Sequence, residues 1–413
     1  MYSLLIHTYV FLVRIAACFG HKKGRLLLEG QRRTWDILKE KVNPSKKYIW
    51  CHAASAGEFE QGKPLIEAIR RKYPQYGILL TFFSPSGYEV KKNYTGADIV
   101  CYLPFDTPKR VKRFFDTVSI VAAVFVKYEV WGNYLSALQR KGIPAYLVSA
   151  VFRKGQLFFR RYGRPYAKML LRFTRIFVQD EDSQSLLSRV SVKAVTVAGD
   201  IRFDRVVEIQ KQSVKVEAVE KLRKQAEGKG RVLVAGSTWP EDEDILISYF
   251  NAHPELFLAL APHEIDEERL KRLEKKLQRP SLRLSAAMTN VKKAENADCL
   301  LVDNYGLLSS LYRYGDMAYV GGGFGDGIHN TLEAAVYGIP VFFGPNYFRF
   351  REARELVACG GAFPVEDYQH LETRLTKLVA SDHVLMQFGQ AASNYVRQNT
   401  GATERVLERL AIP

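Results

Sequence analysis

A cluster of glycines late in the chain is typical of a site where backbone approaches a phosphate group. Residues 319–345 read YVGGGFGDGIHNTLEAAVYGIPVFFGP, and five of the seven residues in Gly321–Gly327 are glycine. Backbone without a Cβ can come close to a ligand. The pattern predicts a following helix with His329, Asn330 and Glu333 near its start, where N–H groups favour an anion and a carboxylate can accept two ribose hydroxyls. The run lacks the G-x-G-x-x-G arrangement of a dinucleotide site after the first strand, so an oxidoreductase is disfavoured.

Two other loops at predicted strand ends carry hydroxyl and imidazole groups. VAGSTWPEDE (234–243) places Ser237 and Thr238 before an acidic helix start, which suits phosphate or pyrimidine contacts. It lacks G-x-x-x-x-G-K-[ST], so it is not a P-loop. LAPHEIDEER (260–269) ends a strand near His263. A lone histidine there is more often structural than catalytic, but a position facing the same cleft favours a role in binding.

Two glutamates at predicted strand ends are candidates for acid–base chemistry. In CHAASAGEFEQ (51–61), Glu58 opens a helix after a turn of small residues, where it could act as general base for an attacking hydroxyl. An acidic residue at a helix start also stabilises the helix dipole without any catalytic role. In VFVKYEVWGN (124–133), Glu129 follows an apolar strand, and a structural carboxylate beside the packed Trp131 is an equal alternative.

The charge of the chain indicates an anionic partner. Lys and Arg number 60 against 44 Asp and Glu, which gives a formal charge of +16. Residues 151–175 hold eight Lys or Arg and no acid, interleaved with aromatic residues. Such a segment could stack on single-stranded nucleic acid, bind a phosphorylated lipid at a membrane surface, or form a solvated face. The five cysteines are far apart and predict neither a disulfide framework nor a cysteine zinc site.

The elements that position these residues alternate between strands and helices. Short apolar runs from Tyr48–His52 to residues 195–198, and again from 231–236 to 339–344, are each followed by a helical pattern. This alternation predicts an α/β protein with parallel, doubly wound sheets. The charged segment 205–230 separates the two series. The sequence therefore predicts two Rossmann-like domains facing each other, with ligand groups at the carboxyl ends of the strands.

The N-terminus predicts membrane association. MYSLLIHTYVFLVRIAACFG (1–20) is mostly apolar, but His7 and Arg14 interrupt it and no cleavage site follows, which disfavours a signal peptide. A charge at Arg14 is costly at the centre of a bilayer, so an interfacial or partly inserted anchor is expected. The basic residues of 21–33 favour an anionic leaflet and a cytoplasmic body. An ordinary first helix packed on the core is the alternative.

The motifs in this order resemble one family, the Kdo (3-deoxy-D-manno-octulosonic acid) transferases of lipopolysaccharide synthesis, which are membrane-associated glycosyltransferases of GT-B fold. The resemblance rests on HAASAGE, YLPFDTP (102–108), KYEVWGN, VAGDIRFD (197–204), AGST, the glycine-rich loop with HNTLEAA, and YGIPVFFGPNYFRFRE (337–352). Each motif alone is weak, but their order and spacing together are specific. The implied domains are an anchor at 1–20, an acceptor domain at 21–208 and a CMP-sugar domain at 209–413.

The resemblance implies transfer of Kdo from CMP-Kdo to a lipid A precursor, lipid IVA, with inversion and without a metal or other cofactor. Glu58 is then the general base, and Glu129 supports it or places the acceptor. The nucleotide-binding residues are Ser237, Thr238, His263, Gly325, His329, Asn330 and Glu333, and acceptor or membrane contacts are expected from Ser55, Lys127, Arg153, Arg160 and Arg161. The implied protein is a monomer at the cytoplasmic face of the inner membrane, with no nucleic-acid partner.

The chain departs from the family pattern at two places. Pro262-His263-Glu264 stands where relatives have Pro-Arg-His, so a phosphate-binding arginine is missing, and Arg349 or Arg351 is the expected substitute. Ser149-Ala150-Val151 replaces an Asn-Ala-Arg run. Two other functions remain open, a GT-B nucleotide-sugar enzyme such as a sugar epimerase and a basic nucleic-acid-binding protein. The latter leaves the glycine loop unexplained.

Overall fold

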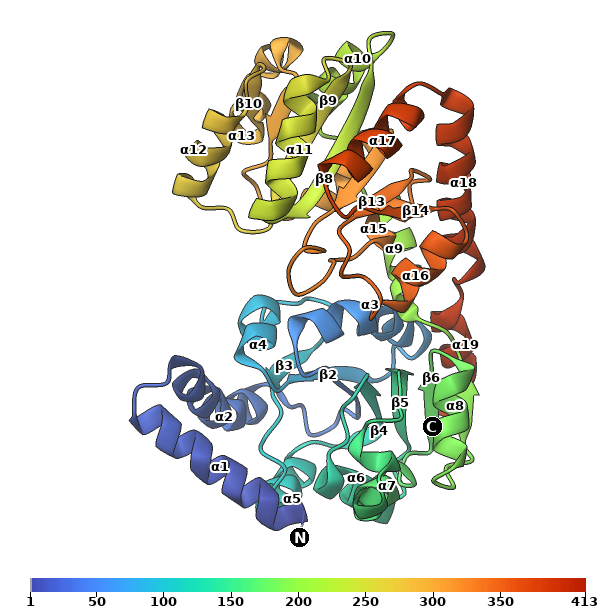
Figure 1. The fold of residues 1–413 in the computed structure, drawn as a ribbon. Helices are drawn as coiled ribbons and strands as arrows, with labels where there is room; N and C mark the ends of the chain where they lie inside the picture. The colour runs from blue at the N-terminus through green and yellow to red at the C-terminus, as the bar shows by residue number, and fades with distance from the viewer. Residues whose placement is uncertain (1) are drawn as a thin grey trace. The chain divides into compact units, whose positions relative to one another are not determined.

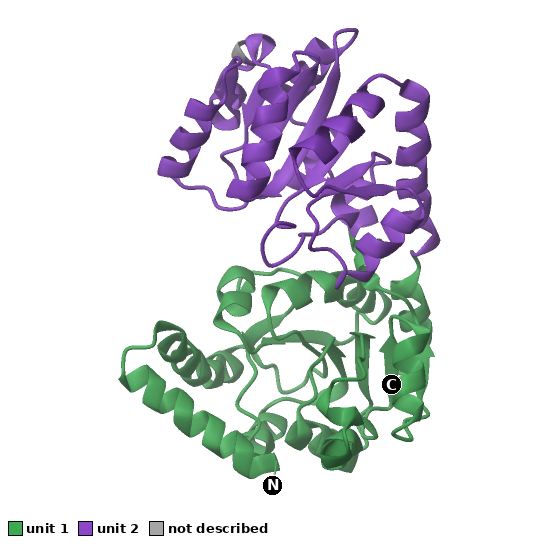
Figure 2. Ribbon diagram, viewed as in Figure 1, with its two compact units in different colours: residues 1–205, 400–413 green, residues 206–399 purple. Residues whose placement is uncertain are grey.

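The protein consists of two compact units, seen in a computed structural model that describes residues 2–413 (Figure 2). Unit 1 comprises the chain up to Arg205 together with residues 400–413, and unit 2 comprises Val206–Asn399. Met1, the first residue of the predicted anchor, lies outside the described residues. Each unit is built around one seven-stranded parallel sheet with helices on it, so the predicted α/β class and doubly wound fold are confirmed (Figure 1).

Unit 1 has the strand order β3-β2-β1-β4-β5-β6-β7. Its strands are β1 (Tyr48–His52), β2 (Gly77–Phe82), β3 (Ile99–Tyr102), β4 (Ile120–Val126), β5 (Ala145–Ala150), β6 (Arg175–Val178) and β7 (Val195–Val197). Its helices are α1 (Tyr2–Cys18), α2 (Lys22–Lys41), α3 (Ala56–Lys72), α4 (Pro85–Lys91), α5 (Pro108–Thr117), α6 (Gly132–Arg140), η1 (Leu157–Phe159), η2 (Arg161–Gly163), α7 (Arg164–Leu170), α8 (Glu181–Ser188) and α19 (Ala402–Glu408). The central strands β1 and β2 are buried throughout and mostly apolar because helices cover both faces of a parallel sheet.

Unit 2 repeats this plan with the order β10-β11-β9-β8-β12-β13-β14. Its strands are β8 (Arg231–Thr238), β9 (Leu256–Pro262), β10 (Ser281–Arg283), β11 (Cys299–Leu301), β12 (Met317–Val320), β13 (Val341–Phe343) and β14 (Ala362–Pro364). Its helices are α10 (Glu217–Ala226), α11 (Pro240–Ala252), α12 (Glu267–Lys276), α13 (Leu284–Thr289), η3 (Val291–Asn296), α14 (Leu308–Leu311), η4 (Tyr312–Tyr314), α15 (Leu332–Ala335), α16 (Arg351–Ala358), α17 (Tyr368–Val379) and α18 (Asp382–Gln398). Helix α9 (Ile201–Lys211) runs from unit 1 into unit 2.

The predicted strands all form, and two further strands were missed. The missed strands, β10 and β14, are three residues long and lie at the two edges of the unit 2 sheet. Edge strands are paired on one side only, so they need no long apolar run and leave a weak signal in the sequence.

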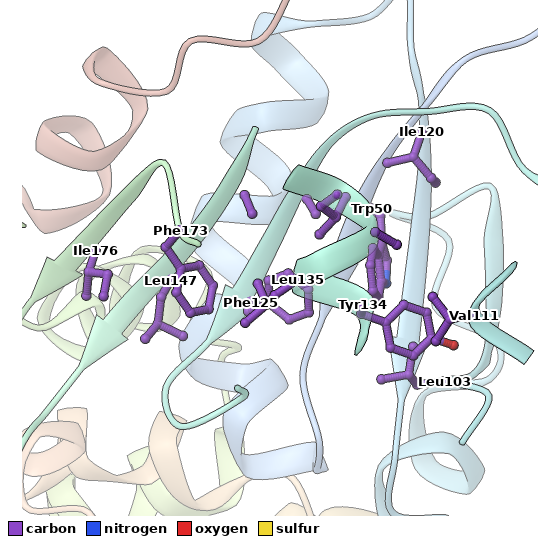
Figure 3. Packing of buried hydrophobic residues seen from close by; sticks show 14 of the residues in the cluster. Trp50, Leu103, Val111, Ile120, Phe125, Tyr134, Leu135, Leu147, Phe173 and Ile176 are labelled. Carbon is purple, nitrogen blue, oxygen red and sulfur yellow. The ribbon is translucent and has the colours of Figure 1, made fainter. Parts of the chain in front are cut away.

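An aromatic cluster holds the central strands of unit 1 together. Trp50 on β1 is fully buried, and its ring lies 4.9 Å from Phe125 on β4 and 5.1 Å from Tyr134 on α6, measured between centroids (Figure 3). The indole Nε1 donates a hydrogen bond to Thr81 Oγ1 on β2 at 2.8 Å. Buried aromatic residues contribute much of the packing energy of a core. The cluster therefore fixes β1 and β4, the two strands that precede Glu58 and Glu129 in the chain.

The end of the chain returns to unit 1. Asp204 accepts hydrogen bonds from the backbone N–H groups of Gly401 and Thr403, both at 2.6 Å, and Arg405 Nε donates to Ala198 O at 2.8 Å. The predicted domain limits of 208/209 and 413 differ from the compact units, because residues 400–413 fold against the VAGDIRFD segment. Their composition does not reveal that contact.

Helix α1 presents an apolar stripe outward. Leu4, Leu5, Phe11, Leu12, Ile15 and the following Phe19, here called the α1 stripe, are exposed, with Phe19 87% and Leu4 69% accessible. The opposite side is attached to unit 1, since Tyr2 Oη donates to Asp106 at 2.6 Å and Val10 is buried. No single helix among residues 2–413 has the length and apolar composition to cross a bilayer, and α1 with α2 meets these criteria only as a pair bent by 118°.

Candidate active site

The predicted carboxylates of unit 1 follow adjacent strands. β1 and β4 are neighbours in the sheet, and the strands on either side of this pair wind away in opposite directions. Ligands of doubly wound sheets bind outside the carboxyl ends of the strands at such a switch point. Glu58 lies in the first turn of α3, the helix that follows β1, and Glu129 lies in the loop after β4. Parallel pairing brings together two residues that are 71 positions apart in the chain.

Glu58 combines a structural and a chemical role. It is the third residue of α3, where its backbone N–H donates to Ser55 Oγ at 3.4 Å and its carboxylate accepts from Ser55 N at 3.1 Å. This capping box fixes the side chain. Burial raises the pKa of Glu58, and the Glu129 carboxylate raises it further, against the opposing effect of backbone N–H groups at Ala54 and Ser55. A raised carboxyl pKa brings a general base closer to neutral pH.

Glu129 is held between the rings of His52 and Trp131. Its Oε2 lies 3.0 Å from His52 Nε2 and accepts a hydrogen bond from Trp131 Nε1 at 2.7 Å. His52 is fully buried and its Nδ1 lies 2.9 Å from Thr81 Oγ1. The carboxylate therefore keeps one orientation. Sequence reasoning missed His52, although a histidine at the end of a buried strand before small residues was a usable signal.

Three residues other than glycine have a left-handed backbone conformation at the ends of strands. Lys127 after β4 has φ +66°, Ser149 in β5 has φ +54° and Ser237 in β8 has φ +53°. A residue other than glycine in the left-handed backbone region costs about 1–3 kcal/mol of conformational energy. Such residues persist where the surrounding structure holds them, commonly at functional sites. Lys127 and Ser237 are two of the predicted site residues, and both stand beside a switch point.

Two of the three predicted arginines of the basic segment share a cavity. Arg160 and Arg161 line a space of about 330 Å³ in unit 1 together with Lys154, Arg164 and Arg189. Arg153 is exposed and is not among the residues that line it. The cavity is thus strongly positive, as expected for an anionic contact.

In unit 2, one buried carboxylate joins the two loops at the switch point between β8 and β12. Asp242 Oδ2 accepts from Trp239 N and from Gly322 N, both at 2.9 Å, and Oδ1 accepts from Tyr319 Oη at 2.7 Å. Burial raises the pKa of Asp242, and these donors oppose the rise. The predicted Ser237–Thr238 turn and glycine run are therefore attached to each other. Sequence reasoning missed Asp242, which reads as an ordinary acidic residue at a helix start.

Aromatic rings stack along this part of unit 2. The His263 ring lies 4.8 Å from Trp239 and 4.4 Å from His329, with interplanar angles of 24° and 23°. Trp239 Nε1 donates to His329 Nε2 at 3.1 Å. Burial, and then His263, lower the pKa of His329, so its neutral form is favoured. The predicted residues His263 and His329 thus meet, with Trp239 as an unpredicted third ring.

The prediction of a helix starting near His329 was wrong in extent. Helix α15 spans only Leu332–Ala335, and His329 and Asn330 lie in the loop before it. Residues 321–340 between β12 and β13 are mostly loop and turn, and Gly338 with φ +74° turns the chain back after α15. Asn330 Nδ2 donates to Glu333 Oε1 at 3.0 Å, so these side chains do stand together. His329 and Asn330 are therefore placed by this loop, and Glu333 by the short helix that follows it.

Arg349 and Arg351, the two arginines proposed to replace the missing phosphate-binding arginine, make different contacts. Arg349 lies against the glycine run, with Nη2 2.6 Å from the point where a Cβ on Gly327 would stand. Arg351 Nε donates to Glu355 at 2.7 Å. Gly325 belongs to the same loop, and its carbonyl accepts from Asn346 Nδ2 at 2.9 Å. Arg349 thus stands beside the glycine run, whereas Arg351 pairs with Glu355 on its own helix.

Comparison with known proteins agrees with these features. Residues 30–205 match the family model of 3-deoxy-D-manno-octulosonic-acid transferase (kdotransferase). Transferases of that name from Aquifex aeolicus and Haemophilus influenzae are 29% and 27% identical, over 83% and 89% of this chain and 89% and 87% of theirs. The crystal structure of UDP-GlcNAc 2-epimerase from Neisseria meningitidis, with TM-score 0.59 and 15% identity, spans 88% of this chain and 98% of its own. That likeness shows the fold, which is of GT-B type. By sequence, the chain is similar to the Kdo transferases of these organisms over parts of both of its units.

Proposed function

We propose that this protein transfers Kdo from CMP-Kdo to lipid IVA, a lipid A precursor, as a glycosyltransferase of lipopolysaccharide synthesis. The observation that carries the proposal is the pair Glu58 and Glu129 at the unit 1 switch point, on a chain similar to Kdo transferases over more than four fifths of its length. A fixed carboxylate with a raised pKa is suited to take a proton from a sugar hydroxyl.

The reaction assigned to these residues is an inverting displacement. The acceptor hydroxyl oxygen forms a bond to the anomeric carbon of Kdo as the bond from that carbon to the CMP phosphate oxygen breaks. CMP leaves with the electron pair, and the hydroxyl proton passes to Glu58. Glu129 is oriented by His52 and Trp131 and is assigned one of two roles. It holds the acceptor, or its negative charge helps to set the raised pKa of Glu58. The loops around Asp242 in unit 2 are assigned to the nucleotide.

Incubation with labelled CMP-Kdo, generated in situ, and lipid IVA followed by mass analysis of the lipid tests the proposal. A product heavier by one or more Kdo units is expected. A lipid of unchanged mass, together with label retained in the donor or free sugar, contradicts transfer. A change in the sugar of the donor itself points to the epimerase alternative.

The pH dependence of Kdo transfer should follow the ionisation of the Glu58 carboxyl group. A base must be ionised, so kcat/KM is expected to fall as the pH drops through the raised pKa of Glu58, at a higher pH than an ordinary glutamate would give. Glu129→Gln removes a like charge and should shift this acid limb to lower pH, whatever it does to the maximal rate. An acid limb that stays in place in the variant contradicts electrostatic coupling between the two residues.

Arg349 is assigned to a phosphate contact in the nucleotide site. Arg349→Ala is expected to raise the KM for CMP-Kdo about tenfold with little change in kcat, because a contact present in ground and transition states is lost. Arg354→Ala, an exposed arginine on α16, is the matched control and should leave KM within twofold. Equal effects in the two variants would place the phosphate contact elsewhere.

The α1 stripe supports a location at the cytoplasmic face of the inner membrane. A stripe of exposed large apolar residues of this kind suits a helix that lies in the membrane interface. The basic residues of 21–33 follow directly and suit an anionic leaflet. Point substitutions test this better than deletion of α1, because deletion would also remove Tyr2 from Asp106 and Val10 from the core.

Leu4→Ser combined with Leu12→Ser should weaken binding to anionic vesicles at least tenfold in co-sedimentation, since each buried leucine contributes about 1.5–3 kcal/mol. Val90→Ser combined with Leu171→Ser removes two exposed aliphatic side chains elsewhere on unit 1 and is the matched control. Vesicle binding that survives in the first variant but not in the second would assign the membrane contact to another surface.

A further inference from the structure

A second cavity of unit 1 lies between α1, α2 and α5 and has no role in the reaction above. Its volume is about 530 Å³. At about 30 Å³ for each water molecule in the liquid, this is room for more than a dozen waters, far more than a single small ion needs. Figure 1 shows α1 and α2 side by side as the first two helices of the chain.

Three arginines from three different helices line this cavity. Arg14 comes from α1, Arg32 from α2 and Arg110 from α5. Among residues 2–413, no carboxylate lies within 4.0 Å of any of their guanidinium groups. Glu29 and Asp36 stand three and four residues from Arg32 on α2 and are its neighbours on the helix surface, but neither lines the cavity. Three guanidinium groups therefore line the cavity without a carboxylate among the lining residues.

Arg110 is held in place on this cavity. Its Nη1 donates to Gln31 Oε1 at 3.0 Å, and its guanidinium lies 4.9 Å from the centroid of the Phe105 ring. The buried Gln31 is itself fixed, because it donates to Leu103 O at 2.7 Å and accepts from Phe105 N at 2.8 Å. Burial, and then the neighbouring Arg14, lower the pKa of Arg110. A bound anion would relieve that repulsion.

Apart from Gln31 and Cys18, the remainder of the lining is apolar and borders the α1 stripe. Ala17, Leu28 and the ring of Trp35 contribute to it. On α1, Arg14 stands three residues after Phe11 of the stripe, and residues three apart are neighbours on a helix surface. Three arginines beside an apolar wall, with no acidic residue in the lining, complement an anionic head group joined to an acyl chain, whereas an inorganic anion would leave the wall without a partner.

We propose that this cavity binds the phosphate head group of an anionic membrane phospholipid, with Arg14, Arg32 and Arg110 on the phosphate and the first part of an acyl chain on the apolar wall. Such a site would fix the protein at one depth and orientation on the leaflet. The binding test uses lipid without donor or acceptor, so its outcome is independent of whether Kdo transfer is observed.

The experiment titrates the full chain with dihexanoyl phosphatidic acid below its micelle concentration, measured by calorimetry and by the fluorescence of Trp35. Dihexanoyl phosphatidylcholine and inorganic phosphate are the comparison probes, and Trp35→Phe identifies the signal. Phosphatidic acid is expected to bind at least tenfold more tightly than either probe. Equal binding of phosphatidylcholine would reduce the site to an apolar groove, and equal binding of phosphate would make it a free-anion site; both overturn the inference.

Arg14→Gln with Arg32→Gln should weaken phosphatidic acid binding at least tenfold, and the Lys pair at the same positions should retain most of the affinity. Arg33→Gln with Lys39→Gln removes the same charge from exposed positions of α2 that do not line the cavity and should stay within twofold. An equal loss of affinity in that control would show that binding depends on the overall positive charge of the surface and not on this cavity, which overturns the inference. A raised KM for lipid IVA in a phospholipid-free assay of the Arg14, Arg32 variant would make the cavity an acceptor subsite and also overturn it.

Discussion

Glu58→Gln should lower kcat for Kdo transfer by roughly 10²–10⁴-fold, the usual contribution of a positioned general base. Glutamine keeps the side-chain oxygen that accepts from Ser55 N, so the start of α3 and the fold should be retained. Binding of CMP-Kdo should be unchanged because the nucleotide residues belong to unit 2. The measurement is the turnover of purified variant with lipid IVA, alongside donor binding by calorimetry and thermal unfolding.

Glu60→Gln is the matched control for this variant. Glu60 lies two residues further along α3 and forms ion pairs with Lys91 and Arg205, which lower its pKa. Its replacement should cost some stability and leave turnover within a few-fold. Turnover like that of the unmodified protein in Glu58→Gln would remove Glu58 as the base, and Glu129 would be the next carboxylate to test.

Asp242→Ala is expected to lower the free energy of unfolding of unit 2 by about 3–5 kcal/mol. The substitution leaves Trp239 N, Gly322 N and the Tyr319 hydroxyl without their acceptor in a buried place, and each hydrogen bond to a charged group contributes about 1.5–3 kcal/mol, offset in part by the desolvation of the carboxylate. Because Asp242 joins the two loops assigned to the nucleotide, the affinity for CMP-Kdo should also fall by more than tenfold. Denaturant unfolding and donor calorimetry measure the two effects.

Asp244→Ala provides the comparison for Asp242. Asp244 stands two residues later on α11, is exposed and pairs with Lys276 at the surface. Surface ion pairs contribute about 0–1 kcal/mol, so unfolding and donor affinity should change little. If Asp242→Ala were no more harmful than this control, the two loops of unit 2 would not depend on the buried carboxylate.

Much of the fold was predictable because parallel strands that are buried on both faces have nearly continuous apolar sequences. β1, β2, β6 and β9 have the predicted bounds, and the alternation with helices gave the α/β class. The short edge strands β10 and β14 and the return of residues 400–413 to unit 1 were not predictable in this way, because a few residues with one-sided or long-range contacts carry no periodic signal.

For the candidate site, the sequence by itself determined which residue types stand at which strand ends. Glu58, Glu129, Ser237 and the glycine run were predicted as candidates from motif, position and the family resemblance. Only the tertiary structure decided what surrounds them, because the partners come from other strands. The carboxylate of Glu129 gains the buried His52 from β1, 77 positions away, and the glycine run gains Asp242, 80 positions from Gly322. Strand order, and the desolvation that comes with burial, set the raised pKa of Glu58, and neither quantity is local in the chain.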